Sequence, residues 1–205
     1  LLNFSHSFDF LCFNETNVTL GTEIKYQLSD YNSEFFSSIN GKSKGSGLAI
    51  YYRKNLNFKI DKSLLMRNEH LECLGGKLKT EIGILNVIVL YRFNHEKDSN
   101  ILFTNLSSIL ERVSSTPSVI LGDFNFDVLK HNESSLTQKY IDTFMCTGFI
   151  PLISKPTHIR GQSSTCIDQI WTNLVSDNVT SGIIASSVSA CLLYTSPSPR
   201  DWTIS

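Results

Sequence analysis

The sequence predicts an α/β protein in which two mixed β-sheets are flanked by helices, a four-layer α/β sandwich. Short apolar runs typical of strands outnumber the helical segments, and several of them follow one another through tight polar joins that suit antiparallel pairs. Two longer segments instead place apolar residues at helical spacing. Strands and helices that share one chain in this way bury their apolar faces against each other in layers.

The N-terminal half is expected to consist mainly of strands. They cover residues 8–13, 47–53, 56–60, 70–78 and 81–91. A polar loop is expected at 29–46, and Lys79 and Thr80 are expected to join the last two strands. The strand at 81–91 is nearly continuous Ile, Val and Leu, a pattern of strands that are covered on both faces.

The C-terminal half combines helices with further strands. We expect Asn100 to cap a helix over residues 101–113 and Ser135 to cap a second helix that stops at Gly148. Strands are expected at 119–123, 164–171 and 179–186.

Composition limits the classes of function. With 205 residues, 41% hydrophobic and 18% charged, the chain is long and apolar enough for one globular domain. A net charge of −1 and a pI near 6.6 exclude a broad basic surface, so any action on phosphates needs a local site, a metal or a neighbouring domain. The cysteines show no paired C-x-x-C spacing, which favours reduced thiols in an intracellular protein that is not secreted. No apolar run reaches the roughly 18 residues of a membrane helix.

The most informative segment is VILGDFN at 119–125. An apolar strand ends in a carboxylate and a carboxamide, and because residues i and i+2 of a strand share a face, Asp123 and Asn125 are expected to point the same way. The alternative is an ordinary Asp/Asn turn after a strand.

Three more polar residues follow strand-like runs. Glu15 follows the run at 8–13, Tyr91 ends the run at 81–91, and Asp168 lies within CIDQI. Each has an ordinary structural explanation: Glu15 would be solvated in a loop, Tyr91 would only pack its ring, and Asp168 would only cap a turn. Their order along the chain, together with GDFN, is a more specific pattern.

This pattern resembles the endonuclease/exonuclease/phosphatase superfamily, and in particular the apurinic-type endonuclease domain of LINE-like, non-LTR retrotransposons. The resemblance rests on FDFLCFNETN, GSGLAIYYRKN, VIVLYR, VILGDFNFDVLK, KPTHIRGQSSTCIDQIWTN and SGIIASSVS, and it covers about residues 5–189. It implies Mg²⁺-dependent phosphodiester hydrolysis, with Mn²⁺ as the other candidate ion, and DNA as the substrate. In the full-length parent protein a reverse-transcriptase domain would accompany it. That parent would be nuclear and would not have a membrane as its partner.

The resemblance also implies a role for each residue. Glu15 would ligate the metal, and Asp123 would activate the attacking water or handle protonation of the leaving group. Asn125 would donate to the phosphate or orient that water, and Tyr91 would donate its hydroxyl to the phosphate. Asp168 would orient a catalytic histidine.

The chain departs from the family at both ends. The family's first strand is not recognisable, and residues 1–7 look like the helix that follows it; the chain also starts with Leu1, so we expect a fragment. The family's closing Ser-Asp-His element does not follow Ser189. Residues 190–205 instead resemble a translated transposase-tagmentation sequencing adapter, although a natural Pro/Ser loop is the alternative.

Three functions therefore stay open. The first is a DNA-nicking endonuclease domain spanning residues 1–189, without its terminal catalytic Asp-His pair. The second is a phosphatase or phosphodiesterase of the same superfamily that acts on small or lipid phosphoesters. The third is a catalytically inactive remnant.

Overall fold

The computed structural model describes residues 8–38, 45–94, 99–161, 163–174, 179–184 and 191–195. The helix expected at 1–7 lies outside these residues, and so does most of the tail at 190–205. Within the tail, strand β14 (Cys191–Thr195) pairs with β13 (Thr180–Ile184).

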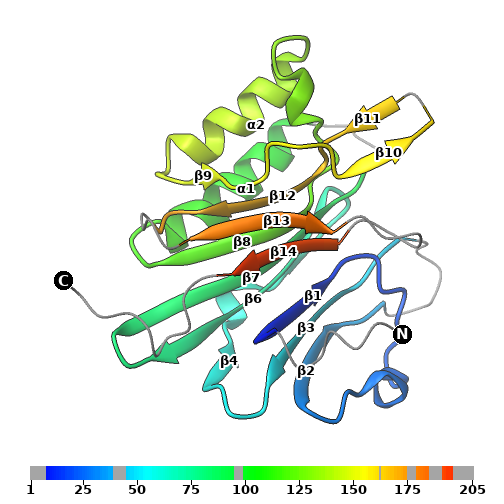
Figure 1. Cartoon of the computed structure of the whole chain (residues 1–205), viewed down its shortest axis with the longest axis vertical. Helices are drawn as coiled ribbons and strands as arrows, with labels where there is room; N and C mark the ends of the chain where they lie inside the picture. The colour runs from blue at the N-terminus through cyan, green and yellow to red at the C-terminus, as the bar shows by residue number, and fades with distance from the viewer. Residues whose placement is uncertain are drawn as a thin grey trace.

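A mixed seven-stranded sheet forms the centre of the molecule (Figure 1). Its strands, in spatial order, are β4 (Phe58–Ile60), β6 (Leu71–Thr80), β7 (Gly83–Arg92), β8 (Ser118–Asp123), β12 (Asp168–Thr172) and β9 (Ile150–Pro151), with β5 (Met66–Arg67) also paired to β6. Only β7 and β8 are parallel among the described pairs of this sheet. A parallel pair needs a crossover, and helix α1 (Ser99–Val113) provides it.

Helices α1 and α2 (Ser135–Met145) cover one face of this sheet (Figure 1). The interface is a buried apolar core to which α1 contributes Leu106 and Leu110, and the sheet contributes Ile88 and Ile120. The apolar residues that recur at helical spacing in both helices thus form the face that each helix turns towards the sheet. No helix in the described ranges is long and apolar enough to cross a membrane.

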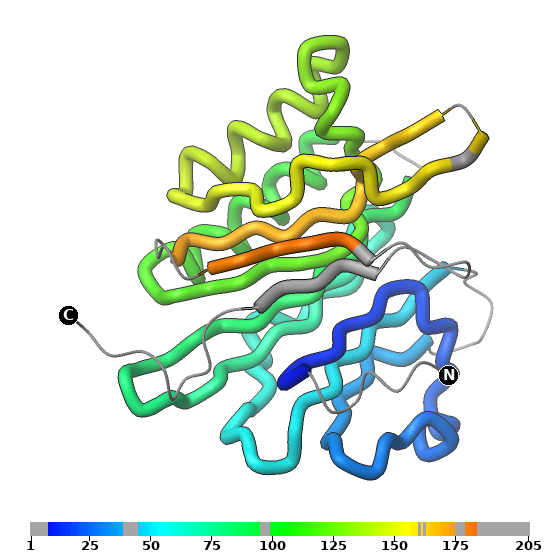
Figure 2. The backbone as a smooth tube through the Cα atoms, in the orientation of Figure 1, coloured from blue at the N-terminus to red at the C-terminus, as the bar shows by residue number. Residues whose placement is uncertain are grey.

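The opposite face of the central sheet packs against smaller sheets (Figure 2). A three-stranded antiparallel sheet consists of β1 (Phe10–Phe13), β3 (Leu48–Arg53) and β2 (Tyr31–Phe36), in the order β1-β3-β2. Its Leu48 and Ile50 meet Val89 and Tyr91 of β7 in a second core. The β13–β14 hairpin lies on the same side, where Ile183 packs against the core of β8 and β12.

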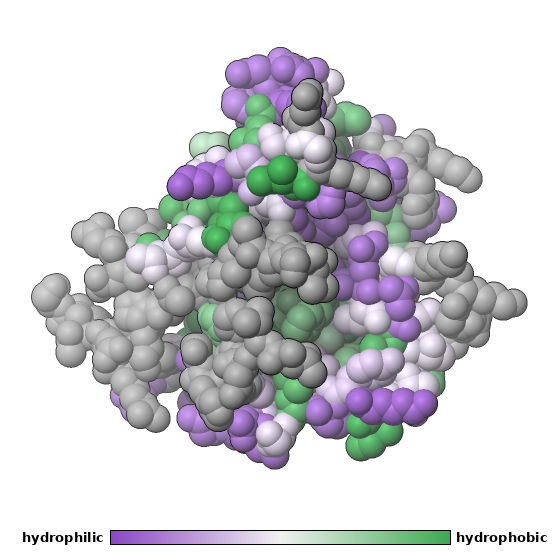
Figure 3. Space-filling view, turned by 45° about the vertical axis from the view of Figure 1, so that its right-hand side comes forward, coloured by the Kyte–Doolittle hydropathy of each residue, from purple (hydrophilic) through white to green (hydrophobic). Residues whose placement is uncertain are grey.

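The remaining regular elements are short and peripheral. They are the 3-10 helices η2 (Glu23–Tyr26), η3 (Lys62–Leu64) and η4 (Val128–Lys130), and the hairpin of β10 (His158–Arg160) and β11 (Ser163–Thr165). Hydrophilic and hydrophobic residues are mixed over the face that Figure 3 shows.

The predicted α/β sandwich is confirmed, and every strand expected within the described residues is present in whole or in part. The polar loop expected at 29–46 is wrong, because it contains β2. This strand lies at a sheet edge, and its three consecutive polar residues, Asn32, Ser33 and Glu34, resemble a loop in sequence. The single strand expected at 164–171 is also wrong. It breaks at Cys166 and Ile167, whose peptide groups bond to Asp127 and Phe124 beyond the end of β8.

Element ends differ by one or two residues. Ser134, not Ser135, caps α2, and its hydroxyl accepts a hydrogen bond from the Thr137 N–H at 3.2 Å. Helix α1 begins at Ser99, so Asn100 lies inside it rather than at its cap. Lys79 and Thr80 belong to β6, and the turn to β7 follows them.

The close approach of β7 and β8 depends on Gly122. Its φ is +153°, and a Cβ at this position would lie 1.7 Å from the Leu90 carbonyl oxygen. That oxygen also accepts a hydrogen bond from the Asn14 side chain at 3.1 Å. A glycine here therefore lets the backbones of β7 and β8 and the Asn14 side chain meet at the end of β8.

We expect Gly122→Ala to lower the free energy of unfolding by more than about 2 kcal/mol, because the obstructing atom is backbone that cannot rotate away. Gly148→Ala is the matched control. Gly148 also has a positive φ, +84°, but a Cβ there meets open space, so it should cost only about 1 kcal/mol. Urea unfolding of both variants measures the difference, and equal losses would contradict the role of Gly122.

Candidate active site

Backbone register brings four polar residues into one row across the central sheet. Glu72 of β6 is paired with Tyr91 of β7, Tyr91 with Asp123 of β8, and Asp123 with Asp168 of β12. Directly opposed residues on neighbouring strands project from the same face. This face is the one that packs against the three-stranded sheet, because Tyr91 lies in that core.

Glu15 reaches this row from the loop after β1. Its carboxylate Oε1 accepts a hydrogen bond from the Tyr91 hydroxyl at 2.5 Å, although the two residues are 76 positions apart in sequence. Glu15 has a φ of +51°, a left-handed conformation that is unusual for a residue with a side chain. The fold thus holds the Glu15 carboxylate against β7 in a backbone geometry that surrounding contacts must maintain.

Asn125 joins the site by a route that strand alternation does not predict. Strand β8 ends at Asp123, and Asn125 follows with a φ of +52°. Its N–H donates to the Asp123 carboxylate at 2.9 Å, and its side-chain amide donates to the Arg92 carbonyl at 2.7 Å. The expectation that Asp123 and Asn125 share a strand face is therefore wrong, but a tight turn still places them together.

Arg92 holds this turn from the other side. Its guanidinium Nη1 donates to the carbonyl oxygens of Phe124 and Asn125, at 3.2 and 3.0 Å, and the group stacks 4.0 Å from the Phe126 ring centroid. Arg92 is buried, so these contacts form in a region of low dielectric. The end of β7 and the turn after β8 are thereby locked together.

Burial and neighbouring carboxylates change the charge of the site. Burial, the Asp168 charge and the Glu15 charge raise the pKa of Asp123 to about 7, and the Asn125 N–H and Arg92 oppose this only in part. Burial and Glu15 likewise raise the pKa of Asp168, against hydrogen bonding with Thr157 and the charge of His158. Negative charge in this row is therefore incompletely balanced by the described residues.

Burial and Glu15 also raise the pKa of Tyr91 above its ordinary value. The phenol consequently keeps its proton at neutral pH and remains a hydrogen-bond donor. In this structure it donates that proton to Glu15, not to the open side of the site.

The structure thus brings together all five residues that the sequence singled out, Glu15, Tyr91, Asp123, Asn125 and Asp168. The sequence offers no histidine at the family's position for Asp168, so no partner is predicted for it within this chain. Within the part of the chain that the structure describes, no histidine forms a hydrogen bond or ion pair with Asp168. The Asp168 N–H donates instead to the Thr157 hydroxyl at 3.2 Å.

Sequence reasoning missed two residues that support the site. Glu72 is fully buried, and the available signal was a carboxylate within the otherwise apolar run LECL. Asn14 was overlooked because its role lies in a bond to the distant Leu90 carbonyl.

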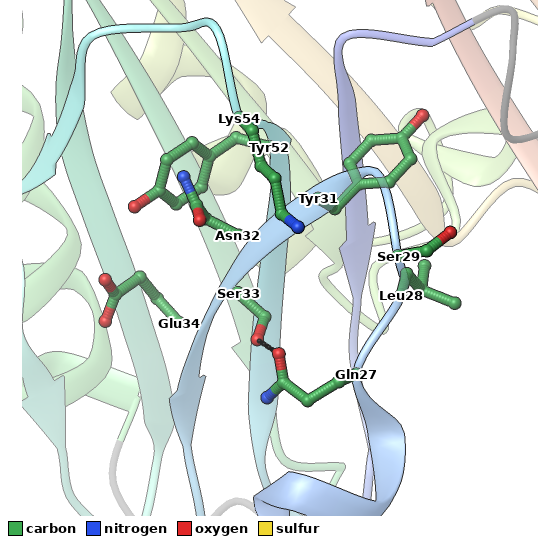
Figure 4. Close-up of a pocket in the computed structure, with 9 residues that line it drawn as sticks. All are labelled: Gln27, Leu28, Ser29, Tyr31, Asn32, Ser33, Glu34, Tyr52 and Lys54. Carbon is green, nitrogen blue, oxygen red and sulfur yellow. Dashed lines mark hydrogen bonds between the residues drawn. The ribbon is translucent and has the colours of Figure 1, made fainter.

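A separate surface pocket lies at the edge strand β2 and is lined by none of these site residues (Figure 4). It is polar, and Ser33 and Gln27 share a hydrogen bond of 3.1 Å within it. The pocket is open and contains no cluster of catalytic groups, so the row on the central sheet remains the candidate active site.

The family model described as "Endonuclease/Exonuclease/phosphatase family" matches residues 2–182. The chain belongs to the endonuclease/exonuclease/phosphatase family. Members of this superfamily are hydrolases that act on phosphodiester bonds. No curated protein sequence matches the chain.

Solved structures share this fold. The endonuclease domain of TRAS1, a telomere-specific non-LTR retrotransposon, is 13% identical with a TM-score of 0.63, and the match covers 80% of each chain. The Xenopus laevis APE2 catalytic domain is 18% identical with a TM-score of 0.59, covering 93% of this chain and 84% of that one. ANGEL2, a 2′,3′-cyclic phosphatase, is 15% identical with a TM-score of 0.55, covering 94% and 75%. At these identities the likeness establishes the fold alone.

The pKa of Asp123 predicts how stability depends on pH. Because its pKa is raised to about 7 in the folded chain, against about 4 unfolded, ionisation opposes folding, and stability present below pH 4 is lost as pH rises through 7. Asp123→Asn should remove roughly 2 kcal/mol of this loss, since one pKa unit is about 1.4 kcal/mol and solvent screens part of it. A smaller decline due to Asp168 should remain.

Asp61→Asn is the control with the opposite sign. Lys77 and Ser63 lower the pKa of Asp61 to about 2, so its contribution is present above pH 4 and is lost as pH falls towards 2. Metal-free urea unfolding between pH 2 and 9 measures both variants. The same pH profile for wild type and Asp123→Asn would contradict the raised pKa.

Proposed function

We propose that this chain is a divalent-metal-dependent phosphodiesterase, specifically the DNA-nicking endonuclease domain of a LINE-like retrotransposon. The observation that carries the proposal is the Glu15–Tyr91 contact beside the Asp123–Asp168 pair. It gathers three carboxylates where β8 ends and β12 begins. Such a site repels a phosphodiester unless a cation is added, so its charge favours metal-assisted chemistry. The sequence motifs, rather than the fold, favour a retrotransposon endonuclease with a reverse-transcriptase domain in the parent protein.

The donor set fits Mg²⁺ or Mn²⁺. Both accept hard carboxylate oxygens, and Mg²⁺ keeps several waters and uses one or two carboxylates together with substrate phosphates. Among the described residues, no group of three or more His, Cys, Asp or Glu is arranged to hold a metal ion, and Mg²⁺ needs only one or two protein carboxylates beside phosphates and waters. We assign Glu15 as the ligand. When bound, the ion would neutralise phosphate charge as the bond to the attacking oxygen forms.

Each of the other residues is suited to a separate step of the reaction. Asp123 with a pKa near 7 is suited either to take a proton from the attacking water or to protonate the leaving oxygen. The Asn125 amide has two N–H groups, of which one bonds to the Arg92 carbonyl, so the other is suited to a phosphate oxygen or the water. The Tyr91 hydroxyl is suited to donate to the phosphate once its bond to Glu15 is exchanged. Asp168 would orient a histidine.

The second candidate is a phosphatase or phosphodiesterase that acts on small or lipid phosphoesters. The observation in its favour is that ANGEL2, named as a 2′,3′-cyclic phosphatase, shares the fold nearly as closely as the endonucleases. A substrate panel separates the two. Release of phosphate from small phosphoesters without nicking of supercoiled DNA would favour this candidate.

Metal binding tests the role of Glu15 without relying on turnover. We expect Mn²⁺ titration followed by electron paramagnetic resonance to show one site, and Glu15→Gln to weaken it by about 10-fold or more because the carboxylate charge is lost. Glu69→Gln, an exposed carboxylate outside the row, should leave the affinity unchanged. Equal affinity of wild type and Glu15→Gln would contradict the assignment.

Nicking activity tests the consequence of the missing histidine. Because no described histidine bonds to Asp168, we expect this chain to nick supercoiled DNA at least about 10²-fold more slowly than an intact family endonuclease, the usual size of one general acid–base contribution. A gel assay with and without EDTA measures the rate. Rapid nicking that both EDTA and Asp123→Ala abolish would show that the chain completes its own site and is not an inactive remnant.

A further inference from the structure

An ion pair between buried Glu72 and partly buried Arg67 lies next to the loop that carries Glu15. Glu72 of β6 is 0% exposed, and its Oε1 accepts a hydrogen bond from Arg67 Nε at 2.6 Å. Its Oε2 accepts a second bond from the Gly47 N–H at 2.8 Å. One carboxylate thus joins the central sheet to a separate loop.

Arg67 extends this connection to the end of β2. Its Nη1 donates to the Ser37 carbonyl at 2.7 Å and its Nη2 to the Phe36 carbonyl at 2.6 Å. The guanidinium also stacks 4.0 Å from the Phe36 ring centroid. The planar fork therefore bonds to both sheets at once, an arrangement that a lysine could not reproduce.

Residues 45–47 run alongside residues 15–17 and transmit this restraint to Glu15. The Thr16 N–H donates to the Gly47 carbonyl at 3.0 Å, and the Asn17 N–H donates to the Ser46 carbonyl at 2.9 Å. Gly45 lies so close that a Cβ on it would be 2.6 Å from Glu15 Oε1. The strained backbone of Glu15 is thus held by hydrogen bonds on its C-terminal side.

We propose that the Arg67–Glu72 pair positions the Glu15 carboxylate by fixing Gly47 and, through it, the backbone at Thr16 and Asn17. The proposal rests on the role of Glu15 as metal ligand in the proposed function. Buried ion pairs contribute little net stability, because desolvation offsets most of their attraction. Their more consistent effect is to specify geometry, and here the geometry specified is that of the loop beside Tyr91.

The double variant Arg67→Met/Glu72→Leu tests the proposal. It replaces the pair by apolar groups of similar size and leaves no buried charge, but it also removes the partners of the Gly47 N–H and of the Ser37 and Phe36 carbonyls. We therefore expect a lower melting temperature with a single cooperative transition. The affinity for Mn²⁺ should fall about 10-fold or more, as for other residues that orient a ligand. Amide hydrogen exchange at Thr16, Asn17 and Gly47 should accelerate, while exchange at Val89 in the β6–β7 ladder should stay slow.

Asp61→Leu/Lys77→Met is the matched control. It removes another ion pair that involves β6, with a separation of 2.6 Å, but this pair does not touch the Glu15 loop. We expect neither the Mn²⁺ affinity nor the exchange at Thr16 to change. If Arg67→Met/Glu72→Leu does not fold, the isosteric Glu72→Gln gives the same test, because its amide NH2 would face one of the two donors, Arg67 Nε–H or the Gly47 N–H, that the two carboxylate oxygens accept from.

The outcomes separate this proposal from the proposed function. Absence of Mn²⁺ binding by the wild-type chain would reject the proposed function, and the exchange rates would still test the restraint on the loop. Wild-type Mn²⁺ affinity and slow exchange at Thr16 and Asn17 in the double variant would overturn the positioning role. Faster exchange at Thr16 and Asn17 together with weaker Mn²⁺ binding, in a variant that unfolds in one cooperative transition and keeps slow exchange at Val89, would support it.

Discussion

The hydrogen-bond register of β6, β7, β8 and β12 determines where every polar group of the site lies. It aligns Glu72, Tyr91, Asp123 and Asp168 in one row, and a shift of one residue in any strand would turn that strand's polar group to the helix-covered face. Gly122 permits the close approach of β7 and β8 on which the row depends. Register is therefore the constraint that turns dispersed residues into a single site.

The row concentrates negative charge that the fold does not neutralise by itself. Arg67 pairs with Glu72 by direct contact, whereas Asp123 has only the Asn125 N–H and a partial effect of Arg92. Glu72 is therefore in direct contact with a cation, whereas the pKa of Asp123 is raised, although the two carboxylates occupy the same row. The difference arises from their partners rather than from their position in the sheet.

Much of this arrangement could be predicted from the sequence, but the supporting contacts could not. Apolar runs located the main strands and helices, and strand ends located Asp123 and Asp168. The edge strand β2 was missed because its half-exposed residues resemble a loop. Asn125 does lie beside Asp123, but the predicted strand alternation does not place it there. A turn in which Asn125 has a left-handed backbone conformation brings the two residues together. Glu72 was missed because its importance comes from pairing with Tyr91, and strand pairing is not visible in local sequence.

Anomalous diffraction from crystals of the wild-type chain soaked in Mn²⁺ tests the central claim most directly, since it locates the cation without requiring turnover. The proposed function predicts a Mn²⁺ peak bonded to the Glu15 carboxylate, on the face of the sheet that carries Asp123 and Asp168. A peak bound elsewhere, or no peak at a concentration that saturates binding in solution, would contradict it. The positions of Gly47 and Thr16 in the same crystals would show whether the loop that carries Glu15 keeps the same conformation when the metal is bound.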